Sequence, residues 1–277
     1  MKKITFVPVG GLANRLRAMA SAVVLAEMTG CELDLYWFQD WALNAPFGAL
    51  FEPVGRTGVR MHESSPWSLL LYDRPRKRNV WIPRLFQKCL FKTTLYEKEM
   101  YTLKLNVSFF THLAQKGGLY IASYHAVVPY TDEQLQSLFR PVPAIRQLIE
   151  KRQQGMAKYR IGVHVRRTDN VDSIQYSPDE LFYEALNQEM ALHPEMSIYL
   201  ATDSEEVKRS FREQYGEKVF YSQVEADRNS IAGIQEAIVE MFVLAGTQKI
   251  YGSYGSSYSD LAAQFGSTQL IKLKKED

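Results

Sequence analysis

The clearest pattern of apolar and polar positions lies at residues 160–165, where Ile161, Val163 and Val165 alternate with Gly162 and His164. A β-branched run with a period of two predicts a buried strand. From there to the C-terminus, segments of strand and helix character alternate. Strands are predicted at 160–165, 197–201, 218–221, 248–251 and 268–272, with helices at 177–192, 204–215, 230–246 and 257–265. This alternation predicts a parallel sheet with helices on both faces.

The first half of the chain begins in the same way but is less regular. Strands are predicted at 4–9, 33–38 and 118–123, with a helix over 12–28, a short helix that begins after an N-cap at Thr131, and another at 145–149. Residues 40–75 contain four prolines, and there we expect only loops and short strands. Pro141 and Pro143 mark the expected domain boundary. A chain of 277 residues is long enough for two domains.

Composition narrows the class of protein. The net charge of +2 gives no general attraction to nucleic acid. Cys31 and Cys89 are far apart and match no metal-ligand spacing, so we expect reduced thiols, as in the cytosol. Asn14, Arg15 and Arg17 interrupt the apolar run at the N-terminus before it reaches the length of a signal peptide. No uncharged apolar stretch of about 18 residues follows. A cytoplasmic protein is expected.

Residues suited to chemistry follow the strand at 160–165. His164, Arg166, Arg167, Thr168 and Asp169 crowd into six positions where a parallel sheet binds its ligands. Adjacent arginines suit phosphate, because a guanidinium is permanently charged and binds two oxygens at once. The alternative is a solvated strand end with a surface ion pair.

Two other strands end in polar loops. Asp203 follows the strand at 197–201, and a Gly/Ser loop that contains Ser256 and Ser257 follows the strand at 248–251. Parallel strands bring all three loops to one edge, where hydroxyls and N–H groups can bind phosphate. An equally good interpretation makes Asp203 the N-cap of the next helix.

The N-terminal turn and one buried acid add further candidates. Gly10 and Gly11, followed by Asn14 and Arg15, form a strand–turn–helix layout typical of phosphate sites, although the motif is not G-x-G-x-x-G. Glu240 interrupts an apolar helix. It either faces a ligand donor such as a base N–H, or belongs to an exposed stripe with Glu236, four residues earlier.

Residues 74–92 contain seven basic side chains and no acid, whereas the rest of the chain holds 26 basic and 31 acidic residues. Interleaved with the charges are the apolar residues Trp81, Leu85, Phe86, Leu90 and Phe91. This stretch suits contact with an anionic membrane surface, at the inner face of the membrane, or with an acidic acceptor. The alternative is a solvated helix over the core.

No metal is expected, because the five histidines form no ligand pair at helical spacing and no strict D-x-D occurs. A pyrophosphate would then be neutralised by arginines and N–H donors.

The motifs G-G-L-A-N-R-L-R (10–17), G-V-H-V-R-R-T-D (162–169), Y-L-A-T-D (199–203) and S-S-Y-S (256–259), in this order, resemble the fucosyltransferase superfamily that uses GDP-fucose. This superfamily includes the alpha-1,2, the alpha-1,6 and nodulation-type enzymes, and the protein O-fucosyltransferases. The resemblance implies a GT-B-like α/β fold with two Rossmann-like domains that face a cleft. Residues 1–140 would form the acceptor domain, and 141–277 the domain that binds the nucleotide sugar.

The resemblance also implies inverting, metal-independent transfer of fucose to a hydroxyl of a glycan or glycoconjugate. Arg166 would bind the β-phosphate, His164 the nucleotide, and Ser256 and Ser257 phosphate oxygens. Arg167 would support the site, and Glu240 stands where the family usually has an aspartate that reads guanine. Asn14 and Arg15 would line the cleft.

Three alternatives remain open from the sequence: a transferase with another sugar nucleotide, a nucleotide- or glycan-binding module without activity, and an NAD(P)-dependent oxidoreductase. For the catalytic base, Glu32, Asp34 and Asp40 are candidates by position only.

Overall fold

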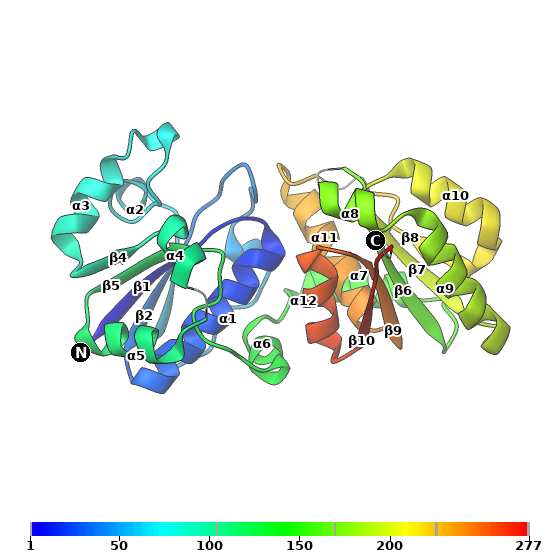
Figure 1. Ribbon diagram of the computed structural model, residues 1–277, viewed down its shortest axis with the longest axis horizontal. Helices are drawn as coiled ribbons and strands as arrows, with labels where there is room; N and C mark the ends of the chain where they lie inside the picture. The colour runs from blue at the N-terminus through cyan, green and yellow to red at the C-terminus, as the bar shows by residue number, and fades with distance from the viewer. Residues whose placement is uncertain (1, 104, 169, 225–226, 276–277) are drawn as a thin grey trace. The chain divides into compact units, whose positions relative to one another are not determined.

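The computed structural model describes residues 2–103, 105–168, 170–224 and 227–275 (Figure 1). The chain divides into two compact units, Met1–Val142 and Pro143–Asp277. None of the described helices is long and apolar enough to cross a membrane.

The first unit is built on a five-stranded sheet in the order β3-β2-β1-β5-β4, and every neighbouring pair of strands is parallel. Its strands are β1 (Lys3–Pro8), β2 (Glu32–Trp37), β3 (Val59–Glu63), β4 (Thr93–Leu95) and β5 (Leu119–Ser123). From the central strand β1, the chain adds β2 and β3 towards one edge of the sheet. It then adds β4 and β5 on the other side of β1. The point where the strand order reverses therefore lies between β1 and β5.

Helices cover both faces of this sheet. They are α1 (Leu12–Thr29), α2 (Pro66–Leu71), α3 (Ile82–Leu90), α4 (Glu97–Leu103), α5 (Val107–Lys116) and α6 (Asp132–Leu138), with short 3-10 turns at Phe47–Ala49 and Lys77–Asn79. α1 packs on β1 and β2, with α5 and α6 beside it. On the other face, Val7, Tyr36 and Tyr120 form a buried cluster against which Tyr72 and Phe91 pack.

The second unit has a second five-stranded parallel sheet, in the order β10-β9-β6-β7-β8. Its strands are β6 (Arg160–Val165), β7 (Ser197–Thr202), β8 (Val219–Tyr221), β9 (Lys249–Ser253) and β10 (Gln269–Leu273). Its helices are α7 (Pro143–Gln153), α8 (Val171–Tyr176), α9 (Asp179–Leu192), α10 (Glu205–Tyr215), α11 (Ile231–Ala245) and α12 (Ser257–Gly266), with a 3-10 turn at Gly216–Lys218.

The alternation along β6 explains how both of its faces are covered. Ile161, Val163 and Val165 belong to one buried core together with side chains of α9 and α10. Gly162 faces the opposite helical layer, where an added Cβ would lie 3.0 Å from Leu244 of α11. Because a strand's side chains alternate between faces, His164 belongs to this second layer too.

The prediction of an α/β fold with two parallel, Rossmann-like sheets is confirmed. All five strands predicted in the second half are present, and so is the helix capped by Thr131, whose hydroxyl accepts from the N–H of Gln134. The prediction of only loops and short strands in 40–75 was wrong, because α2 forms there. Ser65 caps it and Pro66 occupies its first turn.

The two cysteines are free, as predicted: Cys31 is buried in the core and Cys89 is exposed.

Candidate functional site

In the second unit, the predicted strand ends meet at the place where the strand order reverses. β9, β6 and β7 are neighbours, and the reversal lies between β6 and β9. In open parallel sheets, the crevice at the carboxyl ends of such strands is where ligands bind. The backbone N–H of Arg166, after β6, donates to Oγ of Ser253 at the end of β9 (3.1 Å). The structure therefore joins the predicted loops directly.

Asp203, after β7, holds the loop that follows β6. Its carboxylate accepts the backbone N–H of Arg167 at 2.7 Å, and both the N–H and the hydroxyl of Thr168, the hydroxyl at 2.6 Å. The interpretation of Asp203 as an N-cap was wrong, because Ser204 caps α10 by accepting from the N–H of Val207. Asp169, which the sequence also placed in this loop, lies outside the described residues.

The two adjacent arginines have different surroundings. Nη1 of Arg166 lies 3.1 Å from Oδ2 of Asp203, and 23% of the Arg166 side chain remains exposed. Arg167 instead donates to the carbonyl oxygen of Ser177 (2.8 Å) and forms an ion pair with Asp179. Arg167 thus ties its loop to the start of α9, whereas Arg166 presents its charge at the sheet edge.

His164 is buried next to Arg166. Its ring packs against Tyr258 of α12, with the ring centroids 4.9 Å apart, and Nδ1 has no hydrogen-bond partner within the described chain. Burial, and after it the charge of Arg166, lowers the pKa of His164 to about 3, so the imidazole is neutral at ordinary pH.

The Gly/Ser loop leads into α12 as expected. Ser256 is buried at the N-cap position, but its side chain does not cap the helix, and Ser257 is the first helical residue. Gly252 allows the close approach of α12 to β9, because an added Cβ would lie 2.6 Å from Oγ of Ser259. The N-terminus of a ten-residue helix therefore opens beside the Arg166 loop, and helix N-termini attract anions.

Glu240 is buried, with 8% of its surface exposed, and so is Glu236, so the exposed-stripe interpretation was wrong. Glu236 forms an ion pair with Arg152 of α7 (2.7 Å), whereas Oε1 of Glu240 has no hydrogen-bond partner in the described chain. Burial, followed by the charge of Glu236, raises the pKa of Glu240 to about 8. Glu240 is therefore protonated at neutral pH.

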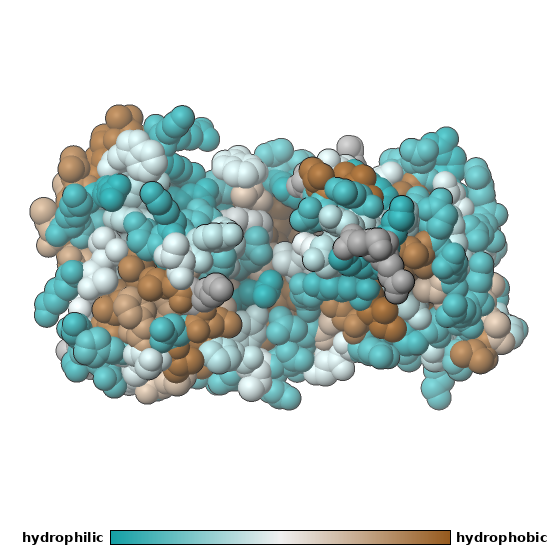
Figure 2. All heavy atoms as spheres, viewed as in Figure 1, coloured by the Kyte–Doolittle hydropathy of each residue, from teal (hydrophilic) through white to brown (hydrophobic). Residues whose placement is uncertain are grey.

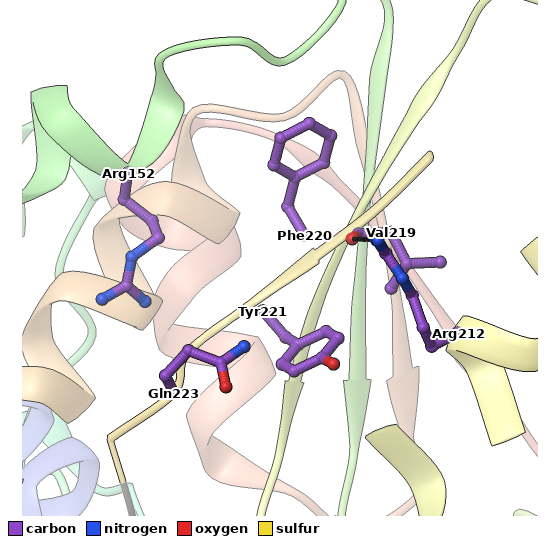
Figure 3. A pocket seen from close by; sticks show the side chains of 6 residues that line it. All are labelled: Arg152, Arg212, Val219, Phe220, Tyr221 and Gln223. Atoms are coloured by element: carbon purple, nitrogen blue, oxygen red, sulfur yellow. Dashed lines mark hydrogen bonds between the residues drawn. The ribbon is translucent and has the colours of Figure 1, made fainter. Parts of the chain in front are cut away.

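A pocket of about 290 Å³ lies beside the edge strand β8 (Figure 3). Its lining residues are Arg152, Arg212, Val219, Phe220, Tyr221 and Gln223. Arg152 also contacts Glu236 and the hydroxyl of Tyr199, so it connects the pocket with the buried acids of α11. No local sequence pattern marks Arg152, because it lies in α7, before the first strand of the unit, and follows no strand end.

The N-terminal motif lies at the equivalent reversal of the first sheet, between β1 and β5. Gly10 has a φ of +88°, which favours glycine, and Asn14 lies against it. Gly11 is the N-cap of α1, and no heavy atom lies within 4 Å of where its Cβ would stand.

Arg15 has the contacts of a structural residue. It is 1% exposed and donates to the carbonyl oxygens of Gly10 and Phe38 and to Asp40, the last at 2.8 Å. Burial lowers its pKa to about 10, which leaves it charged at neutral pH. Its contacts join the turn after β1 to the segment after β2.

The acids suggested as catalytic base are all engaged with cations. Asp34 lies in the middle of β2 and forms ion pairs with Lys3 and Arg60, and it also contacts His62. Glu32 begins β2 and pairs with Arg60. Asp40 is held by Arg15 and also contacts Arg74 (3.3 Å). The described residues contain no group of three or more side chains suited to hold a metal ion.

The two units define an α/β protein with two Rossmann-like sheets, each with polar loops where its strand order reverses. Solved structures with this fold match nearly the whole length of this chain. A structure of NodZ alpha-1,6-fucosyltransferase soaked with GDP-fucose matches with a TM-score of 0.68 at 20% identity, over 98% of this chain and 94% of that one. Fucosyltransferase NodZ from Bradyrhizobium matches with a TM-score of 0.64 at 21% identity, over 94% and 92%.

POFUT1 in its apo form matches with a TM-score of 0.61 at 13% identity, over 98% of this chain and 97% of that one. No protein-family model and no curated protein sequence matches the chain. The structural matches confirm the predicted GT-B-like fold, which this chain shares with fucosyltransferases.

Proposed function

We propose that this protein is a glycosyltransferase that transfers fucose from GDP-fucose to a hydroxyl of a glycan or glycoconjugate, with inversion and without a metal ion. The observation that carries the proposal is the Arg166 guanidinium, held by Asp203 at the sheet edge beside the N-terminus of α12. The fold is that of structures solved with GDP-fucose, which supports this choice of donor.

In the proposed reaction, the bond between the anomeric carbon and the β-phosphate oxygen breaks, and negative charge collects on the departing GDP. Arg166 binds this charge more strongly in the transition state than in the ground state, which accelerates the reaction. The acceptor oxygen attacks the anomeric carbon from the opposite face and forms the new glycosidic bond, and its proton passes to solvent water. Asp203 acts as a positioning residue, because it orients Arg166 and the backbone of its loop.

The rest of the donor site follows the same assignment. His164 contacts the nucleotide, Ser256 and Ser257 bind phosphate oxygens, and Glu240 reads the guanine base. A protonated acid with an unpartnered oxygen suits a base that offers both donors and acceptors. Gly10, Gly11 and Asn14 serve the acceptor side, where Gly11 leaves room for a ligand to approach the backbone.

The test is a thermal-shift series with GDP, GDP-fucose, GDP-mannose, UDP, ADP and NAD. A ligand present at 100 times its Kd stabilises a protein by about 2.7 kcal/mol. We expect guanine nucleotides alone to stabilise the protein, and Arg166→Ala to remove the effect. The matched control is Arg209→Ala, which removes an exposed arginine from α10. Stabilisation by UDP or NAD instead would contradict the choice of donor.

Catalysis is then measured as GDP release from GDP-fucose with a panel of glycan acceptors. Turnover that persists in EDTA and a product of inverted anomeric configuration by NMR are expected. GDP binding without donor consumption by any acceptor would identify a binding module instead.

A further inference from the structure

Exposed apolar side chains gather on α2, α3 and the turn before α3. They are Trp67 and Leu69 of α2, Val80 and Trp81 of the turn, and Ile82, Leu85, Phe86 and Leu90 of α3. Trp67 is 73% exposed, Val80 72% and Leu85 68%. α2 and α3 pack against each other, and Figure 2 shows brown spheres at the upper left, where Figure 1 places them. We call these eight residues the α2–α3 surface.

The helix α3 buries one polar side chain and exposes large apolar ones. Gln87 is fully buried; its amide nitrogen donates to the carbonyl oxygen of Asp73 (2.8 Å), and its amide oxygen accepts from the hydroxyl of Tyr96 (2.9 Å). The exposed side chains of α3 are apolar at Ile82, Leu85, Phe86 and Leu90 and basic at Arg84 and Lys88. A helix that only covers the core carries a polar face outward, whereas α3 exposes several large apolar side chains beside its basic ones.

The turn before α3 holds two large residues in a costly conformation. Val80 has a φ of +52° and Trp81 a φ of +59°, a region that β-branched and bulky residues rarely occupy. Such a conformation costs about 1–3 kcal/mol for each residue. Glycine or asparagine would fit the turn better, so the fold alone does not account for two exposed apolar residues there.

Positive charge accompanies the α2–α3 surface. Five basic side chains of this stretch are exposed: Lys77, Arg78, Arg84, Lys88 and Lys92. Within the described chain, none of the five forms an ion pair with an acidic side chain. The other two, Arg74 and Arg76, are held by Asp40 and Asp73.

We propose that the α2–α3 surface docks onto an anionic lipid bilayer. Its apolar residues would enter the interface, and the basic side chains would meet anionic headgroups. A second copy of the chain suits this surface less well, because a symmetric contact brings its unpaired positive charges together. The described helices offer no membrane span, so this contact would be peripheral.

The experiment is co-sedimentation with vesicles of phosphatidylcholine alone and of phosphatidylcholine mixed with phosphatidylglycerol. We expect binding only to the anionic vesicles, weakened by salt. Lys77→Ala with Arg78→Ala should weaken partitioning roughly 25-fold, because each basic residue near such a surface contributes about fivefold. Lys151→Ala with Lys158→Ala, two exposed lysines of the second unit, should leave it unchanged.

The apolar contribution has its own pair of variants. Leu85→Ser with Phe86→Ser should reduce binding about tenfold or more, whereas Leu148→Ser with Leu192→Ser removes two exposed leucines elsewhere and should have no effect. All of these side chains are exposed, so unchanged melting temperatures are expected. Equal binding to neutral vesicles, no binding, or variants that bind like the parent would each overturn the proposal. The proposal would also be overturned if the protein formed a dimer in solution and the Leu85→Ser, Phe86→Ser double variant dissociated it.

Cys89 offers a direct reporter, because it is exposed on α3 while Cys31 is buried. An environment-sensitive fluorophore on Cys89 should shift to the blue with anionic vesicles and not with neutral ones. An unchanged spectrum would also overturn the proposal. Because GDP-fucose binding is assigned to the second unit and is measured without lipid, failure here leaves the proposed function untouched.

Discussion

Nη1 of Arg166 lies 3.1 Å from Oδ2 of Asp203, and the same carboxylate accepts the backbone N–H groups of Arg167 and Thr168. One acid thus fixes both the direction of the partly exposed Arg166 guanidinium and the path of the loop that carries it. A charge that is oriented before a ligand arrives needs little reorganisation during the reaction.

Arg166→Ala should lower kcat/KM by an amount that corresponds to about 3 kcal/mol or more of lost transition-state stabilisation. This is the scale of one lost oxyanion donor. Asp203→Asn keeps the shape but removes the charge that orients Arg166, so kcat should fall more than KM rises. Steady-state kinetics on both variants and on Arg209→Ala checks this. Near-normal turnover by Arg166→Ala would exclude the assignment.

Glu240→Gln should change how stability depends on pH. The folded protein keeps the Glu240 proton up to about pH 8, whereas the unfolded chain releases it near the ordinary value of 4.5. The contribution of the Glu240 proton to the free energy of unfolding is therefore complete below about pH 4.5. It is lost as the pH rises towards 8, by up to about 1.4 kcal/mol per pH unit.

Urea denaturation from pH 5 to 8 should show a shallower decline for Glu240→Gln than for the parent. Glu236→Gln, which breaks the ion pair with Arg152, should instead be destabilised throughout this range. Parallel curves for the parent and Glu240→Gln would show that Glu240 is already ionised in the folded state.

His164→Gln should reduce sensitivity to acid. The pKa of His164 is lowered to about 3 in the folded protein against 6.5 in the unfolded chain, so the unfolded state takes up a proton first as the pH falls. Stability is complete above pH 6.5 and declines from there towards pH 3. Melting temperatures between pH 4 and 7 should fall less steeply for His164→Gln, whereas the exposed His112→Gln should follow the parent.

Arg15→Ala should destabilise the fold by about 3–5 kcal/mol, because it leaves Asp40 buried without its closest cation and two carbonyl oxygens without a donor. Arg17, two residues later and partly exposed, provides the comparison: Arg17→Ala should change stability little. Chemical denaturation distinguishes the two. Equal stability of both variants would show that Arg15 is free to serve a ligand.

The elements of the second unit could be predicted because their patterns are long and strong. The strand at β6 follows from the alternation around Val163, and every helix there except α8 has a clear apolar face. α8 and α2 have only six residues each, too few for a period to appear. Ser65 followed by Pro66 was nevertheless a readable helix start.

By itself, the sequence determined which loops share one edge of a sheet, because side-chain period and strand direction are local properties that imply a parallel fold. Only the tertiary structure decided the roles of the charged residues within it. Arg166 and Arg167 are neighbours in the chain, yet one meets Asp203 and the other Asp179. Arg15 and Glu240 are buried, and α3 exposes its apolar side. The partner of a charged side chain comes from a distant segment, and the burial of a side chain depends on which elements pack over it. Neither can therefore be predicted from the local sequence pattern.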